Sequence, residues 1–313
     1  MARMNYGAAA CAALERAMAA DARVVALGED VGRGGVFGQY RGLQQKFGAA
    51  RVIDTPISES TIMGAAVGMA LTGLKPVVEM RVVDFALCAI DEIVNQAAKA
   101  RYMFGGQGRV PLVARLPIGL WSGSAAQHSQ SLEAWFAHVP GLVVVTPGTP
   151  QDNHSLLAAA IDCGDPVIFM EHKELWSLEG EVVEGEKVAL GKARVVRQGS
   201  DVTLVTWSRT TQIALEAIEK AKGVSVELID LRTIWPWDRD TVLASAAKTK
   251  RLVVAHEAVR VAGFGAEIAA TVAEELGIPV KRVGGARIPV GYSPPLEDES
   301  RVNAEAILHA LVK

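Results

Sequence analysis

Glu59 stands where a carboxylate can do acid and base chemistry. It opens a predicted helix, and the fifteen residues that follow it, 60–74, are all uncharged, so water is easily excluded around its side chain. A sheltered carboxyl group of this kind can share a proton with a ring nitrogen of a bound heterocycle at neutral pH. The alternative interpretation is a first-turn glutamate that complements the helix dipole. Sequence position alone leaves both interpretations open.

His128 is the second candidate for proton chemistry. It lies in an uncharged segment, residues 119–131, that follows a predicted strand, and open α/β sheets place their sites beyond the carboxyl ends of strands. Gln127, Ser129 and Gln130 can fix the tautomer of its ring, which makes His128 a candidate proton donor. The alternative is a histidine whose ring is satisfied by the local backbone. The other five histidines show no ligand spacing, so we expect no histidine metal centre.

A glycine-rich segment, residues 28–38, follows the first predicted strand, where a nucleotide-binding protein carries its phosphate loop. It contains no G-x-x-x-x-G-K-[ST], and the G-x-G-x-x-G frame that starts at Gly32 breaks at Phe37. We therefore expect neither ATP nor NAD to bind this chain alone. The alternative interpretation of the segment is a turn.

The elements that must position these residues are short apolar runs that alternate with helical stretches. Runs without in/out alternation are typical of parallel strands covered on both faces by crossover helices. Ser58 is expected to cap a helix that runs to Leu71, and Asp84 a helix that runs to Met103. The strands are expected at residues 24–27, 76–83, 111–116, 142–145 and 166–170. The pattern predicts a doubly wound α/β layer.

A second, smaller α/β domain is predicted after a connector. Residues 171–187 carry six acidic residues and no apolar period, which is typical of a solvated connector. We place the first domain at residues 1–185, a linker at 186–200 and the second domain at 201–313. In the second domain, strands are expected at 202–206, 224–229 and 252–255, and helices at 210–221, 239–247, 264–276 and 303–312.

Composition excludes several classes of function. The chain has 313 residues, half of them hydrophobic, and a net charge of −3 with no basic stripe, so we expect no nucleic-acid partner. No uncharged run can span a bilayer, and the start of the chain does not have the character of a signal peptide. Three cysteines without a C-x-x-C indicate a reduced compartment, and we expect a cytoplasmic protein.

Ordered motifs over nearly the whole chain resemble one family. Residues 54–59, Asp-Thr-Pro-Ile-Ser-Glu, and residues 127–131, Gln-His-Ser-Gln-Ser, are followed and preceded by further matching segments. These are Gly-Glu-Asp-Val at 28–31, Ala-Ile-Asp at 89–91, Pro-Gly-Leu at 140–142, Asp-Leu-Arg-Thr at 230–233, His-Glu-Ala at 256–258 and Tyr-Ser-Pro-Pro-Leu-Glu at 292–297. The chain thus resembles the β subunit of the thiamine-diphosphate-dependent dehydrogenase component of 2-oxo acid and acetoin dehydrogenase complexes, which is transketolase-like.

The resemblance implies a fold, a cofactor and partners. The fold is α/β with two doubly wound domains, a thiamine-diphosphate-binding (pyrimidine) domain and then a transketolase C-terminal-like domain. The family's α subunit supplies the diphosphate and magnesium half of the site, and this chain has no Gly-Asp-Gly with a downstream Asn. We therefore expect activity only with an α subunit, as an α2β2 heterotetramer that serves a lipoyl acyltransferase core.

The resemblance also implies roles for single residues. Glu59 would hydrogen-bond the pyrimidine nitrogen and promote its imino tautomer, and His128 would stabilise or protonate the bound intermediate and assist acyl transfer. Phe85 and Ile57 would line the pyrimidine pocket, and Glu29 would belong to an acidic relay between paired sites. A monovalent cation, potassium in some members, would bind near Leu112, Ala160, Ile161, Cys163 and Asp165.

Some residues depart from the family pattern. Cys88 and Glu92 replace common glutamines, and Arg81 stands where a Met or an aromatic residue is usual. Other motifs look acetoin-like, whereas an arginine near the pocket would favour a substrate with a carboxylate. Arg81 and Cys88 are also the only support for a second hypothesis, a non-catalytic assembly subunit that docks an acyltransferase with a decayed pocket.

Overall fold

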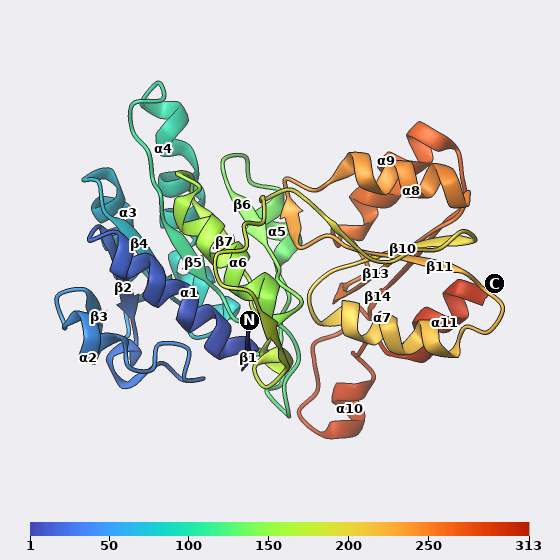
Figure 1. Cartoon of the computed structure of the whole chain (residues 1–313), viewed down its shortest axis with the longest axis horizontal. Helices are drawn as coiled ribbons and strands as arrows, with labels where there is room; N and C mark the ends of the chain where they lie inside the picture. Colours follow the sequence, from blue (N-terminus) through green and yellow to red (C-terminus); the bar gives the residue numbers. More distant parts are fainter. Residues whose placement is uncertain (313) are drawn as a thin grey trace.

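The computed structural model describes residues 1–312 and consists of two α/β units joined side by side (Figure 1). The first unit is built on a seven-stranded sheet with the order β12-β6-β7-β5-β4-β2-β3, parallel except for β12. The strands are β2 (Val24–Gly28), β3 (Val52–Asp54), β4 (Lys75–Glu79), β5 (Val113–Arg115), β6 (Val143–Val145), β7 (Val167–Phe169) and β12 (Thr233–Trp235).

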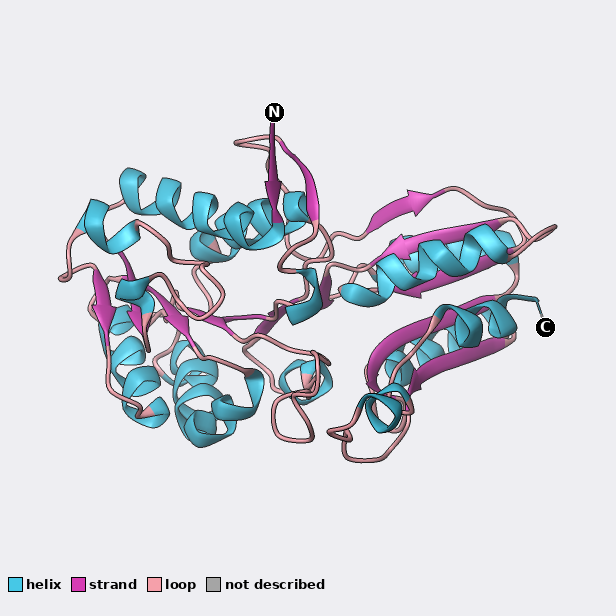
Figure 2. Ribbon diagram, turned by 90° about the horizontal axis from the view of Figure 1, so that it is seen from below, coloured by secondary structure: helices cyan, strands magenta, loops and turns pink. Residues whose placement is uncertain are grey.

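Helices cover both faces of this sheet (Figure 2). One face packs on α1 (Tyr6–Ala20) and α6 (Pro150–Asp162). The other packs on α3 (Glu59–Leu71), on a continuous stretch made of a 3₁₀ helix (Val83–Ala89), a π-helical turn (Glu92–Ala97) and α4 (Ala98–Met103), and on α5 (Glu133–Ala137). Smaller elements are β1 (Ala2–Asn5), α2 (Leu43–Phe47), β8 (Glu179–Val182) and two 3₁₀ turns, Val31–Arg33 and Lys173–Leu175.

The second unit has a five-stranded sheet with the order β14-β13-β10-β11-β9, in which only β9 is antiparallel. The apolar side chains of α7 and α11 pack on one face and those of α8 and α9 on the other. The elements are β9 (Arg194–Arg197), β10 (Val202–Thr206), α7 (Arg209–Lys220), β11 (Val226–Asp230), α8 (Arg239–Thr249), β13 (Leu252–Val259), α9 (Gly265–Leu276), β14 (Val280–Gly285), α10 (Pro294–Asp298) and α11 (Ala304–Val312). The predicted α/β class with two doubly wound units is confirmed.

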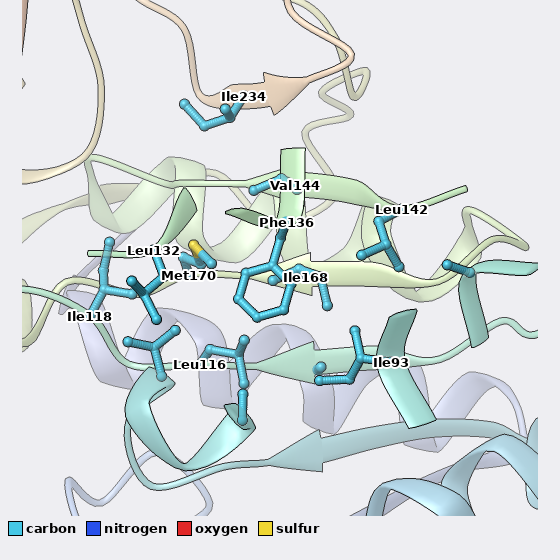
Figure 3. Packing of buried hydrophobic residues seen from close by; sticks show 14 of the residues in the cluster. Ile93, Leu116, Ile118, Leu132, Phe136, Leu142, Val144, Ile168, Met170 and Ile234 are labelled. Carbon is cyan, nitrogen blue, oxygen red and sulfur yellow. The ribbon is translucent and has the colours of Figure 1, made fainter. Parts of the chain in front are cut away.

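The two units share one hydrophobic core. Strand β12 leaves the second half of the chain and pairs with β6, with Thr233 opposite Val145. Figure 3 shows Phe136 of α5 between Ile168 and Val144 of the first sheet, with Ile234 of β12 above them. Apolar burial therefore continues across the boundary and joins the units.

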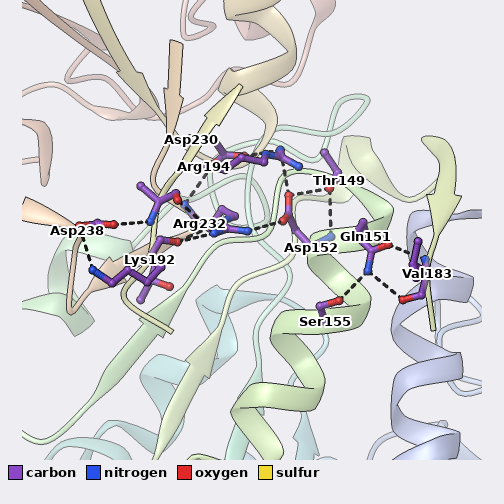
Figure 4. A network of polar contacts seen from close by, with 12 residues as sticks. Thr149, Gln151, Asp152, Ser155, Val183, Lys192, Arg194, Asp230, Arg232 and Asp238 are labelled. Carbon is purple, nitrogen blue, oxygen red and sulfur yellow. Dashed lines mark hydrogen bonds and ion pairs between the residues drawn. The ribbon is translucent and has the colours of Figure 1, made fainter. Parts of the chain in front are cut away.

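A polar network also bridges the units (Figure 4). The guanidinium of Arg194 lies 3.1 Å from a carboxylate oxygen of Asp152 on α6 and 3.1 Å from one of Asp230 at the end of β11. Arg232 adds a contact of 3.4 Å to Asp152. Burial, and then repulsion from Asp152, raise the pKa of Asp230 to about 7.

Two expectations about local structure are wrong. Residues 171–187 are not simply a solvated connector, because Glu171, His172 and Lys173 are buried and β8 pairs with β1. Glu171 is buried because Arg115 binds both of its carboxylate oxygens, a partner that no local pattern reveals. Asp84 does not cap a helix, since the 3₁₀ helix begins after Val82 and the Asp84 carboxylate accepts from the side chain of Gln130.

Membrane spans need long apolar helices, and none of the helices formed within residues 1–312 meets that requirement.

Candidate active site

A cavity of about 300 Å³ opens at the carboxyl ends of β2, β3 and β4. The next two strands along the chain, β3 and β4, lie on opposite sides of β2. The direction in which strands are added to the sheet therefore reverses at β2, and open α/β sheets bind ligands at such switch points. The five residues predicted as catalytic or cofactor-binding all line it. The full lining is Glu29, Val36, Phe37, Ile57, Glu59, Arg81, Val82, Phe85, Trp121, Ser124, His128 and Lys173.

Glu59 is held at the cavity by the turn between β3 and α3. It is the first residue of α3, and its side chain is half-buried within this chain. Ser58 occupies the N-cap position, as predicted, but its hydroxyl donates to Oγ1 of Thr61, 2.8 Å away, and not to the helix backbone. Ile57, two residues earlier, is 77% exposed, so its apolar side chain is left for something outside this chain to cover.

Glu29 and Arg81 form the charged wall of the cavity. Glu29 follows β2 and is 9% exposed, and burial, followed by repulsion from Glu59, raises the pKa of its carboxyl group. The Nη1 atom of Arg81 lies 3.9 Å from Glu29 and 3.6 Å from Asp30. The guanidinium is thus matched by carboxylates of its own chain, which weakens the idea that it receives a substrate carboxylate.

His128 faces Phe85 across the cavity. Their ring centroids are 5.4 Å apart in an edge-on arrangement. The Nδ1 atom of His128 contacts the carbonyl of Gln127, whereas Gln130 is bound to Asp84. Ser129 is buried, and its hydroxyl has no hydrogen-bond partner among residues 1–312. The local backbone therefore orients the ring through Nδ1. Among residues 1–312, none is hydrogen-bonded to Nε2.

Lys173 is a cavity residue that the sequence interpretation missed. It is 3% exposed and donates a hydrogen bond to the backbone carbonyl of His128. Burial lowers the pKa of its ammonium group to about 8, against the opposing attraction of Asp84 and Glu257. The sequence did carry a signal for Lys173, because the Glu-His-Lys triplet at 171–173 comes directly after the last predicted strand of the first sheet. It was missed because the acidic residues that follow indicated a solvated segment.

The residues implied for a monovalent cation lie at the opposite end of the strands from the cavity, near the amino ends of β5 and β7. Ala160 and Ile161 are in the last turn of α6, Cys163 caps it, and Leu112 and Asp165 precede β5 and β7. The Leu112 carbonyl accepts from Val167 at 2.9 Å and the Ala160 carbonyl accepts from Cys163 at 3.2 Å, which leaves each oxygen a second lone pair. No three acidic, histidine or cysteine side chains within residues 1–312 form a metal cluster.

Comparison with known proteins places this geometry in a class. Residues 2–177 match the family described as transketolase, pyrimidine binding domain, and residues 191–307 match transketolase, C-terminal domain. A solved structure titled split gene transketolase, inactive beta4 tetramer, superposes with a TM-score of 0.82 over 97% of this chain and 95% of that one, at 22% identity, and so supports the fold. Fold and cavity define a transketolase-type chain with a pyrimidine-binding domain.

Similar proteins narrow the family further. The β subunit of acetoin:2,6-dichlorophenolindophenol oxidoreductase from Cupriavidus necator is 44% identical, with 91% of this chain and 90% of that protein covered. The 2-oxoisovalerate dehydrogenase β subunit of Bacillus subtilis is 40% identical, covering 99% and 98%. The pyruvate dehydrogenase E1 component subunit beta-1 of Arabidopsis thaliana is 44% identical, covering 95% and 85%. The chain belongs to this family of dehydrogenase E1 β subunits, as its motifs predict.

Proposed function

We propose that this chain, together with an α subunit, forms a thiamine-diphosphate-dependent dehydrogenase component. The enzyme cleaves a small 2-oxo acid or acetoin and passes the acyl unit to a lipoyl acyltransferase. One observation carries the proposal: Glu29, Ile57, Glu59, Phe85 and His128, which come from four separate segments, line a single cavity at the switch point of the first sheet.

The cavity suits the pyrimidine half of the cofactor. Phe85, Val82 and Ile57 offer apolar and aromatic surface to a flat ring, and Glu59 offers a carboxylate to a ring nitrogen. A volume of about 300 Å³ is at the small end for ligand pockets, so it takes a heterocycle and leaves the rest of the cofactor outside. The two cations of the lining are already engaged, Arg81 by nearby carboxylates and Lys173 by the carbonyl of His128. Together with the negative charge of Glu59, this makes the cavity unsuitable for a diphosphate.

The residues of this chain hold and move protons. When bound, thiamine diphosphate supplies the nucleophilic carbon that attacks the substrate carbonyl. Glu59 shares a proton with the pyrimidine nitrogen. Burial, followed by repulsion from Glu59, raises the pKa of the neighbouring Glu29, which favours a protonated carboxyl group there. His128 presents Nε2 to the reacting groups, because Nδ1 is engaged by the backbone, and serves as the proton donor of the later steps.

The α subunit completes the site in this proposal. It binds the diphosphate and magnesium, covers Ile57, and pairs with this chain in an α2β2 heterotetramer. A potassium ion on the carbonyls around Ala160 and Leu112 would stabilise the packing of α6 against the amino ends of the central strands. We also propose a cytoplasmic location, since Cys11, Cys88 and Cys163 are all free, as a reducing compartment requires.

The alternative, a non-catalytic docking subunit with a decayed pocket, is not favoured. Its support was Arg81 and Cys88. Arg81 is matched by Glu29 and Asp30 and leaves the cavity open, and Cys88 is exposed and does not line the cavity.

The proposal is tested with the chain purified together with its α subunit. Calorimetry with thiamine diphosphate and magnesium should show binding, and acetoin, pyruvate or 2-oxoisovalerate should reduce 2,6-dichlorophenolindophenol. Glu59→Gln should lower this activity by about 100-fold or more, while Glu274→Gln on the exposed side of α9 should leave it unchanged. Full activity of Glu59→Gln, or no cofactor uptake by the complex, would refute the proposal.

A further inference from the structure

The loop that carries His128 is tied to the second α/β unit by two carboxylates. The backbone N–H of Leu120 donates to Oε1 of Glu257 at 2.9 Å, and the N–H of Gly123 donates to Oε2 of Glu297 at 2.8 Å. Glu257 lies on β13 and Glu297 on α10, so two separate elements of the second unit bind one loop of the first by hydrogen bonds. We refer to residues 119–131 as the histidine loop.

Both carboxylates are themselves fixed. The Glu257 side chain is 10% exposed, and its oxygens lie 2.9 and 3.0 Å from Nε2 of His172. The Glu297 side chain is 5% exposed and accepts from Arg301 at 3.0 Å. Arg301 also binds Glu174 at 2.6 Å. Burial and second partners leave neither carboxylate free to swing away from the loop.

The same network reaches the other side of the histidine loop. His172 and Glu174, which bind Glu257 and Arg301, flank Lys173, and Lys173 donates to the carbonyl of His128 itself. At the base of the loop the N–H of Gly119 donates to the carbonyl of Gln130 at 3.0 Å. The histidine loop is therefore closed at its base by the Gly119–Gln130 hydrogen bond. Carboxylates of the second unit bind its backbone at Leu120 and Gly123, both before His128.

We propose that Glu257 and Glu297 are positioning residues that place the imidazole of His128 for its proton transfer. The inference rests on the role of His128 in the proposed function. Neither carboxylate lines the cavity that contains Glu59, so losing one should leave cofactor binding intact and slow the step that uses His128. The second unit then has a defined part in the reaction, which is to hold a loop of the first.

The expected effect follows from the sensitivity of proton transfer to geometry. Glu257→Ala leaves the N–H of Leu120 without its acceptor and frees His172. A displacement of the imidazole by about 1 Å should slow acyl transfer by about 10- to 100-fold. Glu257→Gln keeps an oxygen for Leu120 and should recover a large part of the rate. Replacements of Glu297 should show the same order of acyl-transfer rates, with Glu297→Ala slow and Glu297→Gln closer to the wild type.

A double-mutant cycle separates positioning from a general loss of stability. In the complex with the α subunit, we would measure acyl transfer from pyruvate, acetoin or 2-oxoisovalerate to lipoamide for the wild type, His128→Ala, Glu257→Ala and the double variant. If Glu257 acts through His128, the double variant should be as slow as His128→Ala alone. Losses that multiply, or a Glu257→Ala enzyme at the wild-type rate, would overturn the proposal.

Two further measurements keep the outcomes distinct. Calorimetry with thiamine diphosphate and magnesium should give the same affinity for Glu257→Ala as for the wild type, and a large loss would contradict the proposal. Amide hydrogen exchange of residues 117–131 should speed up in Glu257→Ala and not in Glu274→Ala, an exposed site on α9. If His128→Ala itself keeps full activity, the role of His128 in the proposed function fails, whereas unchanged exchange overturns the anchoring of the loop.

Discussion

Gly119 packs so closely against His172 that a Cβ atom on Gly119 would lie 2.0 Å from Nε2 of the imidazole. The backbone of Gly119 has a φ of +89°, which L side chains rarely adopt. The nitrogen that would be displaced is the one that binds Glu257. A single missing side chain therefore permits the contact between the histidine loop and the His172–Glu257 pair.

Gly119→Ala should destabilise the chain more than the same substitution at a positive-φ glycine with free space around it. We expect a loss of about 3 kcal/mol in the free energy of unfolding, because backbone strain and the displacement of His172 add. Gly106→Ala is the matched control, since Gly106 has a φ of +83° with nothing within 4 Å of the added Cβ, and it should cost about 1 kcal/mol. Equal losses for the two variants in urea unfolding would show that the His172 contact is unimportant.

Glu79 should make stability depend on pH. It is 2% exposed at the end of β4, and burial raises the pKa of its carboxyl group from the ordinary 4.5 to about 7, although Arg115 opposes the rise. Between pH 4.5 and 7 the folded chain therefore binds more protons at this group than the unfolded chain does. Its contribution to stability falls as pH rises through this window, and the penalty is complete above pH 7.

Glu79→Gln removes that penalty and keeps an acceptor for Gln39, whose amide lies 3.0 Å from Oε1 of Glu79. The stability gained by the variant should be small at pH 4.5 and grow by about 3 kcal/mol by pH 8. Urea unfolding at both pH values measures the difference, with Glu274→Gln as an exposed control. A gain that stays the same at both pH values would contradict the raised pKa.

The sequence predicts the sheet and most of the cavity because their signals are local. Most of the buried strands are short apolar runs, and His128 lies in the loop that follows one of them, β5, beyond the carboxyl end where a parallel sheet places its site. Glu59 is recognised from the uncharged helix that it opens, because the short strand β3 before it gives no clear apolar run. Long-range pairings leave no local signal. Strand β12 crosses to the first sheet, and Glu171, two residues before Lys173, is buried because Arg115 binds its carboxylate. Both outcomes depend on partners more than 50 residues away.

Arg194 should hold the two units together by separating two buried aspartates. The side chains of Asp152 and Asp230 are 2% and 0% exposed, and Arg194 lies 3.1 Å from each. Arg194→Met would leave them facing each other with only Arg232 near, so Asp230 should take up a proton and the units should pack less tightly. We expect a loss of about 2 to 3 kcal/mol, at or below the lower end of the range for a broken buried pair, because the Arg194 side chain is 32% exposed.

Arg197→Met is the control for this prediction. Arg197 lies on the same strand, β9, but is exposed and forms no ion pair within the described residues, so its replacement should change stability by less than about 0.5 kcal/mol. Unfolding in urea gives both values. Amide hydrogen exchange should also rise in β12 and in the first turn of α6 for Arg194→Met, where the units meet. Equal stabilities for the two variants would mean that the shared apolar core around Phe136 joins the units without help from the charged network.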